Sequence, residues 1–241
     1  MQILLAHVDK LAYKSSKIIN GNKIIPEYYP TILCGDFNCA NHSKLYEFVK
    51  NSKLPNYREL NRNVISGQHE TSRSYKKIEN TLLPEEIGIS DQSQFKVEVD
   101  QRLAEKAATS PNLQAYCTFG GTHLRHTFAF KSVYDHIVND QLEVTSCIQD
   151  QKKIVDFIFY HSEKHEPYSI NSCEIEDKST GDLCQENPLK RPLIEDIVEK
   201  DELELMCKLR LFTVSELDDV SLPNKDYPSD HFLLAAKFIL N

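Results

Sequence analysis

Three short clusters of polar residues could carry out chemistry on a phosphate ester. They read Gly35-Asp36-Phe37-Asn38, Val155-Asp156-Phe157 and Ser229-Asp230-His231. Each cluster places an aspartate next to an apolar run that is typical of a buried strand, where loops gather polar groups over a rigid floor. Hydrolysis of a phosphate ester needs a group that holds the attacking water, donors for the developing charge, and usually a divalent cation. The three clusters supply much of this set.

A role for each polar side chain follows from its chemistry. Asp36 orients and deprotonates the attacking water, and Asn38, two residues further along an extended strand end, donates its amide to a phosphate oxygen. His231 hydrogen-bonds the transferring phosphoryl group, while Asp156 holds the other ring nitrogen and favours the imidazolium. Asp230, together with Asp36, positions a metal ion or its waters. We therefore predict these residues as the catalytic and metal-binding set.

Each cluster also has a purely structural interpretation. Residues 35–38 alone are typical of a turn after a strand, because glycine, aspartate and asparagine are frequent turn formers. Residues 229–231 alone could be a plain loop. Asp156 is harder to explain in this way, since a carboxylate within an apolar strand is costly to bury without a partner.

The elements that hold these clusters can be read from hydrophobic spacing. Residues 2–14 predict an amphipathic helix with Asp9 on its polar side, and helical spacing returns over residues 43–53. Between them, residues 30–36 form an apolar run that a glycine closes, as in a buried strand. Further strands are predicted over residues 116–119, 143–147, 154–160 and 232–239. Together these elements predict an α/β fold in which sheets pack face to face.

Two polar segments interrupt this pattern. Residues 55–111 are rich in serine, asparagine and charge, with a short helix expected over residues 98–108. Residues 162–204 are acidic and contain several prolines, and helical spacing extends over residues 193–211. We interpret both segments as surface insertions in a single domain that spans residues 1–241. The acidic insertion is either a solvated face or a docking site for a protein partner.

Composition limits the classes of partner. A formal net charge of −8 and a pI near 5.6 exclude a broad basic surface for nucleic acid, so contact with RNA requires a local cleft where a cation supplies positive charge. Seven scattered cysteines without a C-x-x-C pair indicate reduced intracellular thiols. No run approaches the roughly 20 apolar residues that span a bilayer. We expect no membrane contact and a cytoplasmic or nuclear location, or both.

Taken in order, the clusters combine with further motifs along nearly the whole chain. These are Leu33-Cys34-Gly35-Asp36-Phe37-Asn38, Leu45-Tyr46-Glu47-Phe48, Ile65-Ser66-Gly67-Gln68, His126-Thr127-Phe128, Ser132-Val133-Tyr134, Val155-Asp156-Phe157-Ile158-Phe159-Tyr160 and Pro228-Ser229-Asp230-His231. With these motifs the chain resembles the deadenylase-like branch of the endonuclease/exonuclease/phosphatase superfamily, and within that branch the Angel proteins. The resemblance implies a four-layer α-β-β-α sandwich of two mixed sheets that face each other.

The same resemblance implies a function. It implies an RNA phosphoesterase that uses Mg²⁺, or alternatively Mn²⁺, and that hydrolyses 2′,3′-cyclic phosphate ends of RNA. The alternative within the branch is a 3′ exoribonuclease that trims poly(A) tails. Such deadenylases carry a phosphate-contacting asparagine in a Phe-Thr-Asn run where this chain has Val144-Thr145-Ser146, which favours the Angel type. By this alignment Ser146 joins Asn38 as a candidate for substrate binding.

The family pattern also contains parts that this sequence lacks. They are an early strand that carries an asparagine, a Leu-Gln-Glu motif whose glutamate is the principal Mg²⁺ ligand, and an Asn-Thr-His strand. The resemblance therefore implies a domain that is incomplete at its N-terminus, in which Asp36 and Asp230 alone would bind the ion weakly. A different class of protein also fits: a non-catalytic RNA- or protein-binding remnant of such an enzyme.

Overall fold

The computed structural model describes residues 1–19, 22–60, 65, 67, 83, 85–108, 110, 113, 117–148, 151–161, 203–218 and 220–240. Nearly all of the insertion expected over residues 162–204, and part of the one over residues 55–111, lie outside this set. Within it, no helix is long and apolar enough to cross a lipid bilayer. The five cysteines that it describes are free thiols.

Short helices and strands alternate along the described chain in a mixed α/β fold. The helices are α1 (Gln2–Ala12), α2 (Lys44–Asn51), α4 (Lys96–Ala107) and the 3-10 helices η1 (Tyr57–Glu59), η2 (Glu85–Ile87) and η3 (Val214–Leu217). The strands are β1 (Tyr13–Ile19), β2 (Lys23–Tyr28), β3 (Thr31–Asp36), β4 (Lys53–Leu54), β5 (Leu124–Arg125), β6 (Phe130–Ser132), β7 (Ile137–Val138), β8 (Gln141–Val144), β9 (Ser146–Ile148), β10 (Gln151–Lys153), β11 (Asp156–His161), β12 (Leu203–Lys208), β13 (Phe212–Thr213) and β14 (Ala236–Leu240). The helices predicted over residues 2–14, 43–53 and 98–108 are confirmed, as are the strands predicted over residues 30–36 and 154–160.

The strands form several small sheets. The central one has the order β3-β11-β6, a second has the order β13-β8-β7, and β1-β2, β4-β5, β9-β10 and β12-β14 are pairs. Every pairing between these named strands is antiparallel. The prediction of mixed sheets is therefore wrong for the described residues. Short turns such as those of β1–β2 and β9–β10 can join antiparallel strands, whereas parallel neighbours need long crossovers.

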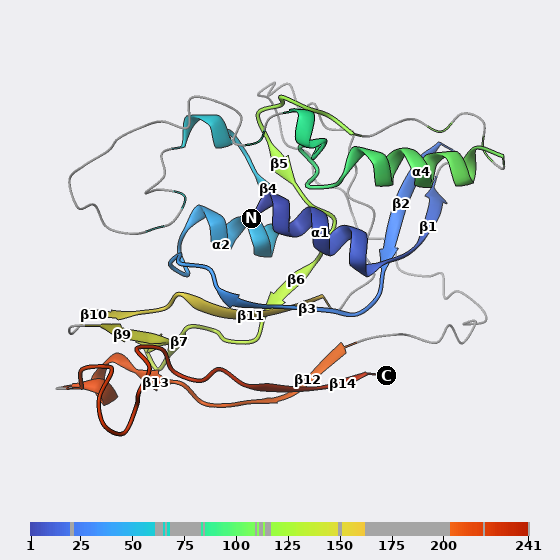
Figure 1. Cartoon of the computed structure of the whole chain (residues 1–241). Helices are drawn as coiled ribbons and strands as arrows, with labels where there is room; N and C mark the ends of the chain where they lie inside the picture. Colours follow the sequence, from blue (N-terminus) through green and yellow to red (C-terminus); the bar gives the residue numbers. More distant parts are fainter. Residues whose placement is uncertain are drawn as a thin grey trace, which may run out of the picture.

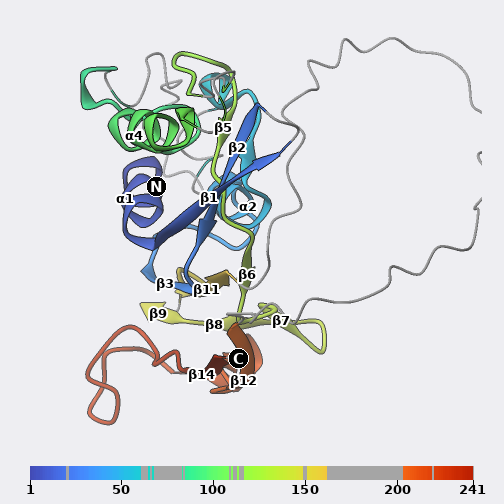
Figure 2. The same cartoon turned by 90° about the vertical axis from the view of Figure 1, so that its right-hand side faces the viewer.

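Strand β11 is covered on both faces, which explains its continuous apolar sequence. Phe157 and Phe159 belong to the largest core, together with residues of α1 and α2. Ile158 belongs to a second cluster, against which β12 and β14 pack. In Figures 1 and 2 the β3-β11-β6 sheet accordingly lies between the α-helices and the β12-β14 pair. No α-helix with described bounds covers the far side of β12-β14, so the four-layer sandwich stays a prediction.

Helix α1 corrects the expected position of Asp9. Instead of facing solvent, Asp9 is 1% exposed, and its carboxylate lies 2.8 Å from the guanidinium of Arg102 on α4. Gln94 donates a second hydrogen bond to Asp9, and the hydroxyl of Tyr28 donates a third. The spacing within α1 could not reveal this contact, because α4 packs on the polar side of α1 from a distant part of the sequence.

Three further expectations needed correction. Residues 203–208 form strand β12 instead of continuing a helix, because Leu205 pairs with Phe238 of β14, and tertiary pairing overrides local spacing. Residues 117–119 are irregular, so the strand predicted there is wrong as far as it is described. The strand predicted over residues 143–147 is broken at Thr145 into β8 and β9.

Candidate active site

Two of the predicted aspartates face each other across the central sheet. Asp36 is the last residue of β3 and Asp156 the first residue of β11, and the antiparallel register pairs them directly. Side chains at directly opposite positions of an antiparallel pair point to the same face of the sheet. The pairing continues one step beyond β3, because the backbone N–H of Phe37 donates to the carbonyl of Val155 at 2.9 Å. The two carboxylates therefore meet at one end of the sheet.

Thr145 fixes the start of β11, a role that its sequence motif alone does not predict. Its hydroxyl accepts hydrogen bonds from the backbone N–H groups of Val155 at 3.0 Å and Asp156 at 3.1 Å. Its backbone carbonyl accepts from the N–H of Phe232 at 2.8 Å, and its side chain is fully buried. A hydroxyl in the middle of a predicted buried strand needs a hydrogen-bond partner. This need is the sequence signal that could have identified Thr145. Thr145 thus links the strand of Asp156 to the segment of His231.

The third cluster is held against the edge of β9. His231 forms an isolated antiparallel bridge with Ser146, and the backbone N–H of Cys147 donates to the carbonyl of Asp230 at 2.9 Å. The hydroxyl of Ser229 accepts from the backbone N–H of His231 at 3.0 Å. These backbone contacts fix the position of the His231 side chain.

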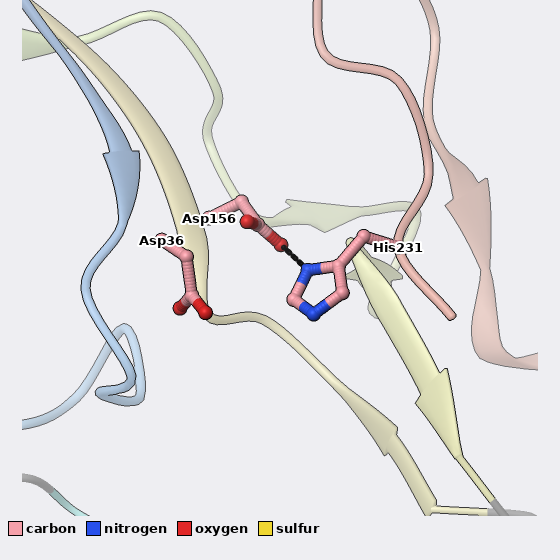
Figure 3. A group of neighbouring side chains, drawn as sticks. All are labelled: Asp36, Asp156 and His231. Atoms are coloured by element: carbon pink, nitrogen blue, oxygen red, sulfur yellow. Dashed lines mark hydrogen bonds and ion pairs between the residues drawn. The ribbon is translucent and has the colours of Figure 1, made fainter. Parts of the chain in front are cut away.

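The structure brings Asp36, Asp156 and His231 together. One possible ligand atom from each lies within 4.8 Å of the others. Figure 3 shows the three side chains next to one another. His231 Nδ1 lies 2.8 Å from Asp156 Oδ2, and the dashed line in Figure 3 marks this contact. Asp230 lies on the other side of the ring, with Oδ2 at 3.7 Å from His231 Nε2. Residues far apart in sequence therefore form one acidic group around an imidazole.

Electrostatics favours a charged His231. Partial burial of the ring lowers its pKa, but the hydrogen bond to Asp156 and the charges of Asp156, Asp230 and Asp36 outweigh that effect. The net result is a pKa of His231 above its ordinary value. An imidazolium at this place could donate a proton or a hydrogen bond to a phosphate oxygen.

Two predicted substrate-binding residues lie near this group, in settings that differ from the expectation. Asn38 is not in an extended strand end, because its φ is 48° and its side-chain amide donates to Asp36 at 3.1 Å. Its backbone N–H also donates to Asp36 at 2.8 Å, as in the turn interpretation of this motif. Asparagine tolerates this left-handed conformation better than most residues do. Ser146 lies beside His231 but is only 3% exposed.

The donor atoms fit a divalent cation. Among the described residues, the ligand atoms that lie close enough to share a cation come from Asp36, Asp156 and His231, and the predicted ligand Asp230 is not part of this group. Hard divalent cations such as Mg²⁺ prefer carboxylate oxygens. Three carboxylates around one imidazole also leave this end of the sheet negative, which a cation would offset before a phosphate could approach.

Comparisons with known proteins identify relatives of this chain. The chain is 28% identical to human protein angel homolog 2 over an alignment of 250 positions, which covers 100% of this chain and 40% of that protein. It is 33% identical to the mouse protein of the same name over 225 residues, or 88% of this chain and 36% of that protein. It thus spans well under half the length of these relatives. No family model matches the sequence.

Solved structures give the same result. The crystal structure of ANGEL2, described as a 2′,3′-cyclic phosphatase, matches with a TM-score of 0.64 and 26% identity, over 98% of this chain and 50% of that one. Its complex with adenosine-2′,3′-vanadate matches with the same TM-score and identity, over 99% of this chain and 50% of that one. Similarity in sequence and in structure thus extends over nearly the whole chain. The chain therefore belongs to the Angel homolog family, within the endonuclease/exonuclease/phosphatase superfamily.

Proposed function

We propose that this chain carries the catalytic centre of a Mg²⁺-dependent RNA phosphoesterase that hydrolyses 2′,3′-cyclic phosphate ends. The observation that carries this proposal is the hydrogen-bonded pair of Asp156 and His231, with Asp36 within reach of both. Support also comes from the likeness to ANGEL2, a 2′,3′-cyclic phosphatase that has been crystallised with adenosine-2′,3′-vanadate. Ser146, in place of the asparagine of deadenylases, argues against poly(A) trimming as the main activity.

Each side chain of the site has a separate role in the proposed reaction. Asp36 orients a water molecule and accepts its proton while the water oxygen bonds to phosphorus. One of the two bonds between phosphorus and a ribose oxygen breaks, and the ribose oxygen that leaves takes up a proton from solvent. His231, held by Asp156 and favoured in its charged form, donates a hydrogen bond to a phosphoryl oxygen as negative charge develops there. Asn38 keeps the carboxylate of Asp36 in place through its amide and backbone N–H.

Asp36 would hold Mg²⁺, with Asp230 as the second predicted ligand. When bound, the ion would neutralise their charge and polarise the phosphate. Ser146, which forms an isolated bridge with His231, is the further candidate for substrate binding. RNA is the proposed partner.

Turnover of two RNAs tests this function. One RNA ends in a 2′,3′-cyclic phosphate and the other in a poly(A) tail, and product release is followed with Mg²⁺ and with EDTA. We expect the wild type to open the cyclic phosphate only when Mg²⁺ is present. Asp36→Asn should abolish this reaction. Shortening of the tail would instead support the exonuclease alternative. If the folded chain binds both RNAs but turns over neither, the non-catalytic binding alternative is correct.

Several finer expectations stay predictions. They are the organisation as a single domain with two insertions, the docking of a protein partner on the acidic insertion, the four-layer sandwich, and the cytoplasmic or nuclear location. Limited proteolysis tests the first of them. A single-domain chain should be cut first within the insertion predicted over residues 162–204 and retain the remainder as one resistant unit.

A further inference from the structure

An apolar groove lies directly beside the candidate active site. It has a volume of about 400 Å³ and is lined by residues 209–212, 227–229 and 231–233. Its aromatic lining consists of Phe212, Tyr227 and Phe232, and its polar lining includes Arg210 and His231. His231 therefore belongs both to the acidic group with Asp36 and Asp156 and to this groove.

The aromatic wall of the groove is anchored in a core cluster. Phe232 is 8% exposed and packs in the same cluster as Val144 and Cys147. Its ring centroid lies 5.2 Å from that of Phe212 and 6.0 Å from that of Tyr227. Tyr227 is 46% exposed, so its ring extends the buried aromatic wall to the mouth of the groove.

Backbone contacts fix Tyr227 at this mouth. The side-chain carbonyl of Asn224 accepts from the backbone N–H groups of Asp226 and Tyr227, each at 2.9 Å. The backbone N–H of Asn224 donates in turn to the carbonyl of Tyr227 at 2.8 Å. This turn fixes the backbone at Tyr227, whose ring is exposed, and such preorganisation lowers the entropy lost on binding.

The chemistry of the groove suits a flat aromatic ligand. Its volume falls in the range of small-molecule sites, which are mostly apolar with a few polar groups. A phosphate that contacts His231 brings its attached nucleoside beside the groove, because the same histidine lines both. Tyrosine and phenylalanine rings stack on nucleobases with little dependence on sequence. Arg210 forms two hydrogen bonds to Glu216 and lines the same groove. Its guanidinium is a positive group that could contact the RNA backbone.

We propose that this groove binds a nucleobase of the RNA next to the reacting phosphate, and that Tyr227 stacks on that base. The proposal rests on the proposed function, since it uses RNA as the substrate. It adds a binding site on the residues that flank His231, outside the group of Asp36 and Asp156. Tyr227 would then determine how strongly the enzyme prefers nucleotides over smaller cyclic phosphates.

Kinetics with matched substrates tests the groove. The substrates are an RNA that ends in a 2′,3′-cyclic phosphate and a methyl riboside 2′,3′-cyclic phosphate, which lacks a base. We expect Tyr227→Ala to raise KM for the RNA by about tenfold, since loss of one stacking contact has an effect of this order. KM for the methyl riboside should stay unchanged, because this substrate has no base. Tyr227→Phe should behave like the wild type. An unchanged KM for the RNA, or an equal rise for both substrates, would overturn the proposal.

Two further variants control for the fold. Tyr29→Ala removes a tyrosine of similar exposure, 52%, that lies away from the groove, and should leave KM unchanged. Asn224→Ala opens the turn that holds Tyr227 and should raise KM for the RNA in the same direction as Tyr227→Ala. Thermal unfolding of each variant, followed by circular dichroism, identifies any that do not fold.

Equilibrium binding separates this proposal from the proposed function. Fluorescence anisotropy measures binding of RNAs with a normal or an abasic 3′ end to the wild type, to Asp36→Asn and to Tyr227→Ala. If the wild type binds the normal end more tightly than the abasic end, and Tyr227→Ala abolishes this difference, the result supports base binding in the groove. This holds even if no RNA is hydrolysed. If the wild type binds both ends equally, the proposal that the groove binds a base is overturned, even if hydrolysis is normal.

Discussion

His231 Nδ1 and Asp156 Oδ2 lie 2.8 Å apart, although 75 positions separate the two residues in the sequence. The contact forms because Asp156 begins the central strand β11, while the segment of His231 pairs with β9. An aspartate that holds one ring nitrogen fixes the orientation of the imidazole and favours its charged form. The other nitrogen, Nε2, is then the atom that faces Asp230 and an incoming phosphate.

Replacement of Asp156 by asparagine should lower the pKa of His231. The side chain keeps its shape, but the hydrogen bond to a carboxylate and its negative charge are lost, while burial of the ring still disfavours the imidazolium. NMR titration of the ring C–H signals measures this pKa directly. If the protonated ring is needed for turnover, the alkaline limb of the pH–rate profile should move to lower pH as well. Asp36→Asn serves as the control and should lower the pKa less, because Asp36 acts on His231 only through its charge.

Thr145→Val should weaken both the fold and the site. Valine keeps the volume but leaves the backbone N–H groups of Val155 and Asp156 without the acceptor that they use now, which costs on the order of 1–3 kcal/mol for each buried group. Urea unfolding should show this loss. NMR titration should show a lower pKa of His231, because Asp156 is no longer held in place. Thr145→Ser keeps the hydroxyl and should restore the pKa. A normal His231 pKa in Thr145→Val would argue against the positioning role.

The sequence was most informative where polar residues follow or precede apolar strands. Asp36, Asp156 and His231 could be grouped because each flanks a run that was predicted as a strand, and β3 and β11 do pair directly. The part played by Thr145 was missed because its partners lie 10 and 11 positions away in a strand whose pairing was unknown. Asn38 was placed wrongly, since local spacing does not reveal a left-handed residue in a turn.

The surroundings of α1 show why the rest could not be predicted. Hydrophobic spacing assigned one apolar face of this helix to the core only in part, because Leu5 and Ala12 are buried whereas Ile3, Leu4 and Leu11 are exposed. It assigned Asp9 to solvent, because a helix pattern contains no information on a second helix that packs later in the chain. Arg102, 93 positions away, supplies the charge that makes the burial of Asp9 tolerable.

Arg102→Met should therefore destabilise the protein strongly. It leaves the carboxylate of Asp9 buried without its cation, and the loss of one partner of a buried pair costs about 3–5 kcal/mol. The free energy of unfolding in urea measures the effect. The double variant Asp9→Leu with Arg102→Met should be more stable than Arg102→Met alone, since no charge then remains buried. Lys96→Met, which breaks the exposed pair with Asp100 on the same helix, should change the stability by about 1 kcal/mol or less. Equal losses in Arg102→Met and Lys96→Met would contradict this account.

His136 should make the stability depend on pH. Its ring is 2% exposed, and Nδ1 has no hydrogen-bond partner among the described residues, so burial lowers the pKa from 6.5 to about 4 in the folded state. Between pH 4 and pH 6.5 the unfolded chain binds a proton at His136 that the folded chain does not. The contribution of the neutral His136 ring to stability is therefore complete above pH 6.5 and is lost as the pH falls towards 4. The loss is on the order of 3 kcal/mol at the acidic end.

A neutral replacement at this position tests the assignment. His136 has a φ of 68°, which asparagine tolerates, so His136→Asn removes the titrating group with little added backbone strain. Urea unfolding at several pH values should show a shallower slope between pH 4 and 6.5 in His136→Asn than in the wild type. His42→Asn replaces a histidine that is exposed to solvent in the folded state, and this control variant should keep the wild-type slope. If both variants keep that slope, another group is responsible, and the ring of His136 is not held neutral by its burial.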